Sequence, residues 1–137
     1  MIALETNVLV RLVIRDDDAQ SDAAERVVRR SARTDEALYV ADAVLCEFTW
    51  TLQAVYKVAR RDVAAALQQL LESDRFQFED RSGVERAVQA FRDRKGGFAD
   101  SLIRERALAA GASAVVTFDR ALRADAAFRV LGDRRRP

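Results

Sequence analysis

Four acidic side chains stand at positions where a carboxylate is unexpected. Glu47 interrupts the otherwise uncharged run AVLCEFTW (residues 43–50), and Glu5 directly follows the apolar segment IAL. Asp100 comes after the flexible GGFA, and Asp119 closes SAVVTF. Carboxylates that converge at close range cannot all stay ionised unless a cation or protons neutralise them. Carboxylate oxygens suit a hard divalent metal, so these four residues are the candidate metal ligands and catalytic groups.

The composition further limits the kinds of catalytic and metal site that this chain can form. The sequence contains no histidine and a single cysteine, Cys46. These counts exclude Ser-His and Cys-His catalysis, histidine-based ribonuclease chemistry, ordinary zinc sites and an internal disulfide. Any bound metal must use oxygen ligands, which favours Mg²⁺ or Mn²⁺ ahead of Ca²⁺.

Each acid taken alone also has a purely structural explanation. Asp100 could cap a helix, and Asp119 could be a residue of a strand-to-turn connection. Glu47 could form an ion pair with an arginine such as Arg11 or Arg104, and the remaining acid could face solvent at a strand end. A metal site therefore requires a fold that brings all four acids to one place.

The segments between the acids alternate between strand and helix patterns. Strands are expected at residues 1–4, 37–40, 76–78, 113–118 and 128–131, of which the β-branched 113–118 is the clearest. Residues 7–14 either continue the first strand or begin a helix, because their β-branched content fits both.

Apolar residues at helical spacing predict the helices. They are expected at residues 19–32, over the residues around Leu45 to Tyr56, after Asp62 as a cap, after the capping box SGVE at 82–85, at about 100–110 and, as a short helix, at 121–125. Gly111 is expected to end the helix at 100–110 in a left-handed conformation.

This alternation predicts an α/β fold: a three-layer sandwich with a central parallel sheet of about four to five strands and helices on both faces. In such sheets functional residues collect outside the carboxyl ends of the strands. The 137 residues, half of them hydrophobic, fit one domain, 1–137, and the net charge of +1 demands neither a nucleic-acid nor a membrane partner. The sequence shows no membrane span and no signal-peptide layout, so we expect a cytoplasmic protein.

Four segments carry a resemblance to a known family. MIALETNVLVRLVIRDD, EFTWTL, ADSLI and VVTFDRAL resemble the PIN-domain family, and in particular the VapC-type toxins of bacterial toxin–antitoxin pairs. The resemblance covers essentially the whole chain. It implies a PIN-like domain that uses Mg²⁺ or Mn²⁺ to hydrolyse RNA phosphodiester bonds, with tRNA or ribosomal RNA as substrate. It also implies a VapB-type antitoxin as partner and a homodimer.

The resemblance assigns the acids individually. Glu5 stands where the family has the aspartate of D-T-N, and Glu47 matches the family's helix glutamate. Asp100 matches the aspartate that precedes LI, and Asp119 matches the aspartate of TFDR. Three polar residues match those that support the acids: Thr6, Asn7 and Thr117.

Glu5 departs from the family pattern, which has aspartate at this position. The extra methylene moves the carboxylate oxygens by about 1.5 Å, a bond length. Mg²⁺ requires near-octahedral ligands at about 2.0–2.1 Å, so the longer side chain could weaken the site. One alternative is therefore a catalytically weak PIN-like protein that acts mainly by binding its antitoxin. A receiver-like phosphoacceptor domain fits less well, because no strand carries the lysine it needs and LET supplies only one acid.

An acidic pocket repels RNA, so the substrate needs cations around the rim. The candidate RNA-binding residues are Arg11, Arg15, Lys95, Arg104 and Arg120, with the RRR run at 134–136 as an additional arm.

Overall fold

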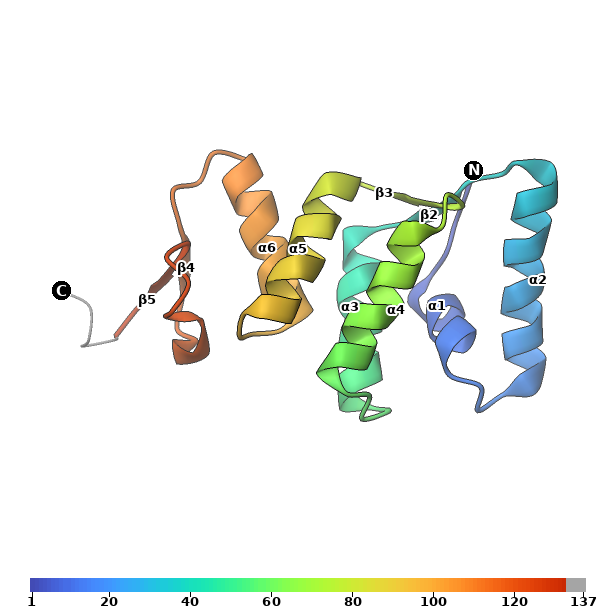
Figure 1. Cartoon of the computed structure of the whole chain (residues 1–137), viewed down its shortest axis with the longest axis horizontal. Coiled ribbons are helices and arrows are strands. Elements are labelled where there is room, and N and C mark those ends of the chain that lie inside the picture. Colours follow the sequence, from blue (N-terminus) through green and yellow to red (C-terminus); the bar gives the residue numbers. More distant parts are fainter. Residues whose placement is uncertain (133–137) are drawn as a thin grey trace. The chain divides into compact units, whose positions relative to one another are not determined.

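Helices and strands alternate along the chain in the computed structural model, which describes residues 1–132 (Figure 1). Two compact units, Met1–Arg81 and Ser82–Pro137, divide the chain and are treated separately below. The α/β prediction is confirmed, since the described residues form six α-helices and five strands and every strand pair is parallel. The strands pair as one three-stranded and one two-stranded sheet, whereas the sequence predicted a single central sheet.

The first unit contains the three-stranded sheet, in the order β1-β2-β3. The strands are β1 (Ile2–Ala3), β2 (Leu38–Val40) and β3 (Phe76–Phe78). Parallel neighbours need a crossover, and here each crossover is a pair of helices. The helices are α1 (Thr6–Val13) and α2 (Asp18–Thr34) before β2, then α3 (Asp42–Ala54) and α4 (Arg60–Glu72) before β3.

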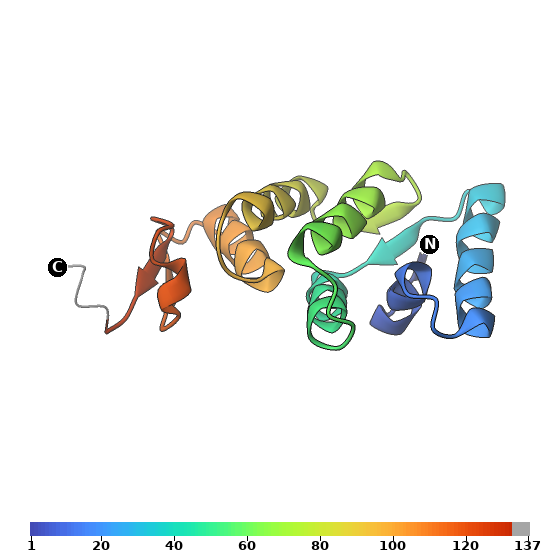
Figure 2. The same ribbon diagram turned by 60° about the horizontal axis from the view of Figure 1, so that its bottom comes forward.

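Residues 7–14, which the sequence left open between strand and helix, are helical up to Val13. Thr6, Leu9 and Val10 are buried at a spacing of three and four residues, which is the spacing of one helix face. Helix α1 lies beside α2 in both ribbon views (Figures 1 and 2). The same periodicity buries Leu45 and Phe48 on α3, directly beside the exposed Glu47.

The second unit combines two helices with the two-stranded sheet. Its elements are α5 (Arg81–Asp93), α6 (Phe98–Ala109), β4 (Val115–Thr117), the 3₁₀ helix η1 (Arg120–Leu122) and β5 (Phe128–Val130). Phe91 and Phe98 meet edge to face with their ring centroids 6.1 Å apart, which packs the end of α5 against the start of α6.

Two predicted helix starts are wrong. Helix α5 already begins at Arg81, so Ser82 lies inside it and is not an N-cap. Helix α4 begins at Arg60, and Asp62 lies in its first turn, where a carboxylate is favourable beside the helix dipole. The prediction for Gly111 is confirmed, since its φ of 93° lies in the left-handed region just after α6. No helix within residues 1–132 is long and apolar enough to cross a lipid bilayer.

Candidate functional site

Glu5 lies at the carboxyl end of β1 and at the start of α1. The pairing of β1 with β2 continues to Leu4, whose N–H donates to the Tyr39 carbonyl at 2.9 Å. Glu5 is the N-cap residue of α1 and its carbonyl accepts from Val8 N–H at 3.1 Å, but its side chain makes no capping hydrogen bond. The Glu5 side chain is exposed at this strand end, which fits both a ligand position and the solvent-facing alternative.

Glu47 lies on the second turn of α3, shortly after β2. Its Oε2 accepts a hydrogen bond from the Thr6 hydroxyl at 3.1 Å. Thr6 is only 9% exposed and follows Glu5 directly, so it connects the segments that carry the two glutamates. The Arg11 guanidinium does not neutralise Glu47, since it instead contacts side chains of the α1–α2 connection, of α2 and of the segment that follows α3.

Asp100 lies in the first turn of α6 and closes that turn. Its Oδ2 accepts from the Gly97 N–H at 2.9 Å, where Gly97 is the N-cap residue. The capping role considered for Asp100 is therefore real, although Asp100 acts from the third helical position. The preceding Gly96 has a φ of 97°, and a Cβ there would lie 2.5 Å from Leu122 Cδ2 and 3.2 Å from Asp100 Oδ2. Only glycine fits this position without displacing its neighbours.

Asp119 is the N-cap residue of η1, directly after β4. Its Oδ1 accepts from Ala121 N–H at 2.9 Å, and its own N–H donates to the Thr117 hydroxyl at 3.0 Å. The Thr117 hydroxyl therefore binds the backbone of Asp119, and its support of the Asp119 carboxylate stays a prediction. Because Leu122 of η1 packs at the Gly96 position, the segments that carry Asp100 and Asp119 are in contact.

The four acids divide equally between the units. Glu5 and Glu47 belong to residues 1–81, and Asp100 and Asp119 belong to residues 82–132. Within the described chain, no group of three or more Asp, Glu or Cys side chains is close enough to hold a metal ion. The convergence of all four acids stays a prediction. Asn7, predicted to support them, lies on the exposed side of α1 beside a hollow of about 290 Å³ against α2.

The donor set fits a hard divalent cation. Every donor is an oxygen, and Glu5 keeps both carboxylate oxygens free of hydrogen bonds from the described residues. The Thr6 bond occupies one oxygen of Glu47 and leaves the other available. Carboxylates with a free oxygen and an orienting hydroxyl are ligands that Mg²⁺ and Mn²⁺ accept.

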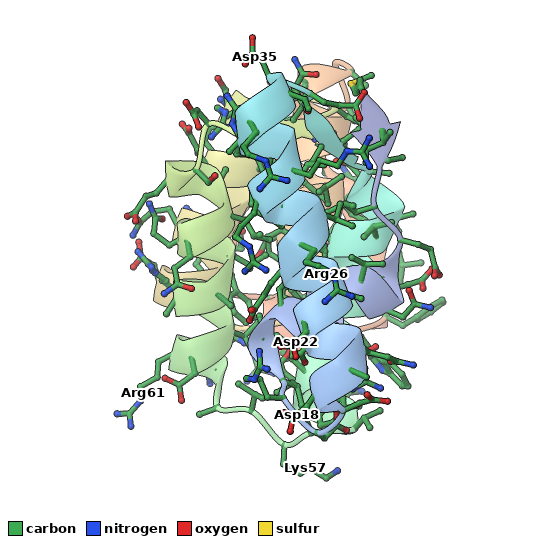
Figure 3. All side chains as sticks on the ribbon, turned by 90° about the vertical axis from the view of Figure 1, so that its right-hand side faces the viewer. Asp18, Asp22, Arg26, Asp35, Lys57 and Arg61 are labelled. Carbon is green, nitrogen blue, oxygen red and sulfur yellow. The ribbon has the colours of Figure 1, made fainter. Side chains whose placement is uncertain are left out.

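Three of the five predicted RNA-binding cations are paired within the protein. Arg11 contacts Asp16, and Arg15 binds Asp22 at 2.8 Å and Glu25 at 2.6 Å. The carboxylates Asp18 and Asp22 project from α2 in Figure 3. The hydrogen bond that Arg15 donates to Asp22 raises the pKa of Arg15. These arginines stabilise the α1–α2 region in the structure.

Arg104 is the third paired cation. Its Nη1 lies 2.7 Å from Glu105, a carboxylate that is 6% exposed, and its Nε lies 2.8 Å from Asp125 Oδ2. Arg86 binds the other oxygen of Glu105 at 2.9 Å. Burial of Glu105 requires such pairing. Arg86 joins α5 to α6 through Glu105, and Arg104 joins α6 to the segment that carries Asp125.

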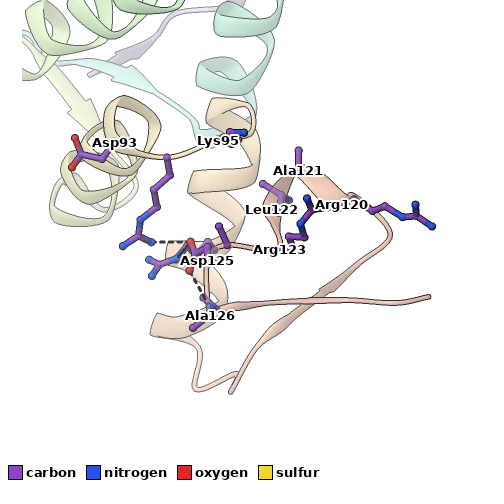
Figure 4. A pocket seen from close by; sticks show the side chains of 12 residues that line it. Asp93, Lys95, Arg120, Ala121, Leu122, Arg123, Asp125 and Ala126 are labelled. Atoms are coloured by element: carbon purple, nitrogen blue, oxygen red, sulfur yellow. Dashed lines mark hydrogen bonds and ion pairs between the residues drawn. The ribbon is translucent and has the colours of Figure 1, made fainter. Parts of the chain in front are cut away.

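The remaining two predicted cations, Lys95 and Arg120, line one hollow of about 800 Å³ in the second unit. We name it the basic cleft and define it by six residues: Arg94, Lys95, Arg104, Arg120, Arg123 and Asp125 (Figure 4).

Arg94, Arg123 and Asp125 were missed at the sequence level. The RK pair before GG and the spacing of three between Arg120 and Arg123 are the signals that could have indicated them. The run RRR at 134–136 lies outside the described residues.

Asp125 is a carboxylate of the basic cleft that binds two of its arginines. Its Oδ2 binds Arg94 at 2.7 Å, and its Oδ1 accepts from the Ala127 N–H at 3.0 Å. Burial raises the pKa of Asp125, but the Ala127 and Arg94 hydrogen bonds and the charge of Arg104 outweigh burial and hold that pKa below its ordinary value. Asp125 therefore carries its charge between two guanidinium groups.

Comparisons with known proteins agree with the resemblance found in the sequence. Residues 2–127 match the PIN domain. The chain is also similar to the VapC ribonuclease of Aquifex aeolicus (strain VF5), with 26% identity over 120 residues that cover 88% of each chain. The matched range contains all four acids and the basic cleft, and it extends across both units.

Proposed function

Because the chain belongs to the PIN-domain family, we propose that it is a metal-dependent endoribonuclease that hydrolyses RNA phosphodiester bonds. The observation that carries the proposal is the family match across residues 2–127, which includes every one of the four acids. The similarity to a protein named VapC ribonuclease supports the same reaction and substrate. The continuous match also supports one PIN-like domain for 1–137.

We propose that Glu5, Glu47, Asp100 and Asp119 hold Mg²⁺ or Mn²⁺ directly or through water. A bound divalent ion lowers the pKa of a coordinated water and offsets the negative charge that builds on the phosphate. The carboxylates are also the available proton acceptors, since the chain has no histidine.

The bonds around the acids suit them to these roles. The Thr6 hydroxyl fixes the direction of the Glu47 carboxylate. Backbone N–H groups orient Asp100 and Asp119 by the bonds from Gly97 and Ala121. Supporting bonds of this kind position metal-binding carboxylates in other metal sites.

The toxin role, the VapB-type antitoxin partner and the homodimer follow from the resemblance and stay predictions. Glu5 favours one alternative within this family, a weak nuclease that acts mainly by binding its antitoxin. Co-purification with a small partner, combined with no metal-dependent cleavage, would support this alternative.

The test is cleavage of end-labelled tRNA and ribosomal RNA by the full chain with Mg²⁺, with Mn²⁺ and with EDTA. We expect cleavage with either metal and none with EDTA. Asp100→Asn and Asp119→Asn keep the oxygen that accepts the backbone hydrogen bond, so both variants should fold normally. Each should cleave more than about 100-fold more slowly, beyond the usual cost of losing a supporting residue.

Asp62→Asn is the matched control, because Asp62 is an exposed aspartate in the first turn of α4. It should leave the cleavage rate unchanged. Full activity of the Asp100 and Asp119 variants, or cleavage that persists in EDTA, would rule out the proposed mechanism.

A further inference from the structure

The basic cleft carries more positive charge than its own acids neutralise. Among residues 1–132, five cations line it, and Asp93 and Asp125 are the lining carboxylates, which leaves an excess of three positive charges. Asp93 additionally accepts a hydrogen bond from Gln89 at 2.8 Å. An excess of cations in a concave surface concentrates the field and attracts a polyanion.

The five cations fall into two groups. Arg94 and Arg104 both bind Asp125 and are thereby fixed in place. The other three, Lys95, Arg120 and Arg123, make no ion pair or side-chain hydrogen bond with any residue of the described chain. In Figure 4 the Arg120 side chain points away from Asp125. The paired arginines form a rigid base, and the three unpaired cations are available to a ligand.

The place of the cleft in the fold connects it to the candidate catalytic acids. Arg120 directly follows Asp119, and Leu122 lines the cleft. Leu122 also packs at Gly96, beside the Asp100 carboxylate. A ligand in the basic cleft therefore lies next to the segments that carry two of the four acids.

We propose that the basic cleft binds the phosphodiester backbone of the RNA strand and delivers it to the acids. This inference rests on the proposed function, since it assigns a binding surface to the same substrate. Arginine guanidinium groups match phosphate oxygens in geometry as well as in charge. No aromatic residue lines the cleft, so it offers the bases no stacking surface, and contact through the backbone is independent of sequence.

The experiment measures binding without cleavage. A fluorescently labelled single-stranded RNA is titrated with the full chain in EDTA, and its anisotropy gives the Kd at several KCl concentrations. The test protein is the triple variant Lys95→Gln, Arg120→Gln and Arg123→Gln. The control is the triple variant Arg26→Gln, Arg33→Gln and Arg61→Gln, which changes the net charge equally at exposed positions of the first unit, two of them visible in Figure 3.

The cleft variant should bind RNA at least about 10-fold more weakly at low salt. Each lost phosphate contact lowers the slope of log K against log salt by about 0.7, so the slope should fall by about 2. The control variant should keep the slope of the unmodified chain. Equal losses in both variants, an unchanged slope in the cleft variant, or no RNA binding by the unmodified chain would overturn the inference.

Two further measurements separate this inference from the proposed function. If polyglutamate binds through the same three cations and RNA does not, the cleft is a site for an acidic peptide and the inference fails. If the cleft variant keeps normal binding and normal Mn²⁺-dependent cleavage, the inference fails while the nuclease function stands. If the chain cleaves no RNA but its binding still depends on the three cations, the nuclease function fails while the inference stands.

Discussion

The two pairs of acids are held in different ways. In the second unit, Asp100 and Asp119 each accept a hydrogen bond from a backbone N–H at the start of a helix. In the first unit, Glu47 accepts one bond from a side-chain hydroxyl, and Glu5 accepts none through its carboxylate. The aspartate pair is fixed by the fold of its own unit, whereas the glutamate pair depends on one threonine.

The two pairs of acids therefore differ in how much their carboxylates contribute to folding. A backbone bond persists whether or not a metal is bound, so Asp100 and Asp119 contribute to folding independently of the metal-binding role proposed for them. The Glu5 carboxylate accepts no hydrogen bond from residues 1–132, so removal of its charge in Glu5→Gln should change metal binding with little effect on folding. The predictions below test this contrast between the two units.

The largest expected effect comes from substitution of Gly96, where the segments that carry Asp100 and Asp119 are in contact. Gly96→Ala forces a positive φ on alanine and pushes a methyl group against Leu122 Cδ2, at a cost of about 2–4 kcal/mol in unfolding free energy. Urea denaturation measures this loss. Gly111→Ala is the matched control, because Gly111 has a φ of 93° but nothing lies within 4 Å of its added Cβ.

The control should lose only about 1–2 kcal/mol, the cost of a left-handed alanine. Equal losses at both glycines would mean that contact with Leu122 does not hold the Asp100 segment in place.

The next effect concerns Glu5. Glu5→Asp restores the shorter side chain of the family at the strand end, so the Mn²⁺ concentration needed for half-maximal RNA cleavage should fall about 10-fold. Aspartate is also a better N-cap than glutamate, and α1 should gain about 0.5–1 kcal/mol of stability. Glu5→Gln keeps the length of the side chain but removes its charge. The Mn²⁺ concentration needed for half-maximal RNA cleavage should therefore rise. A Glu5→Asp variant with unchanged metal dependence would show that side-chain length at this position is immaterial.

The smallest expected effect comes from loss of the hydrogen bond that the Thr6 hydroxyl donates to Glu47. Thr6→Val removes the hydroxyl that binds Glu47 and keeps the branched shape of the side chain, so cleavage should slow by up to about 10-fold. Unfolding free energy should change by about 1 kcal/mol or less. Thr34→Val is the control, because the Thr34 hydroxyl binds a backbone carbonyl on α2. If both variants cleave alike, Thr6 does not orient Glu47.

The order of elements was largely predictable because the apolar periodicity is strong. The β-branched SAVVTF gives β4 (Val115–Thr117), and the spacing of Leu45 and Phe48 gives the buried face of α3. Helix starts were less predictable, since a pattern such as SGVE also occurs inside a helix. Ser82 matched the capping box, yet α5 had already begun one residue earlier.

The candidate site was predictable in its residue types but not in its bonds. Strand ends and helix starts identified the four acids as unusual, and the Thr6–Glu47 bond agrees with that reading. Sequence could not show which arginines are neutralised. Arg15 and Arg104 seemed as available as Arg120, but their carboxylate partners lie on other segments that only the fold brings near. The left-handed conformation of Gly96 could not be predicted from the sequence either, because it depends on contact with Leu122, 26 positions away.

That contact has a consequence for how related chains diverge. A side chain at position 96 becomes tolerable only when the residue at position 122 is small enough to vacate the space near the Gly96 Cα. The two positions should therefore co-vary across homologues: glycine at 96 where a leucine-sized residue occupies 122, and larger residues at 96 only together with alanine or glycine at 122. Such co-variation would reflect a physical constraint on where the Asp100 carboxylate is placed.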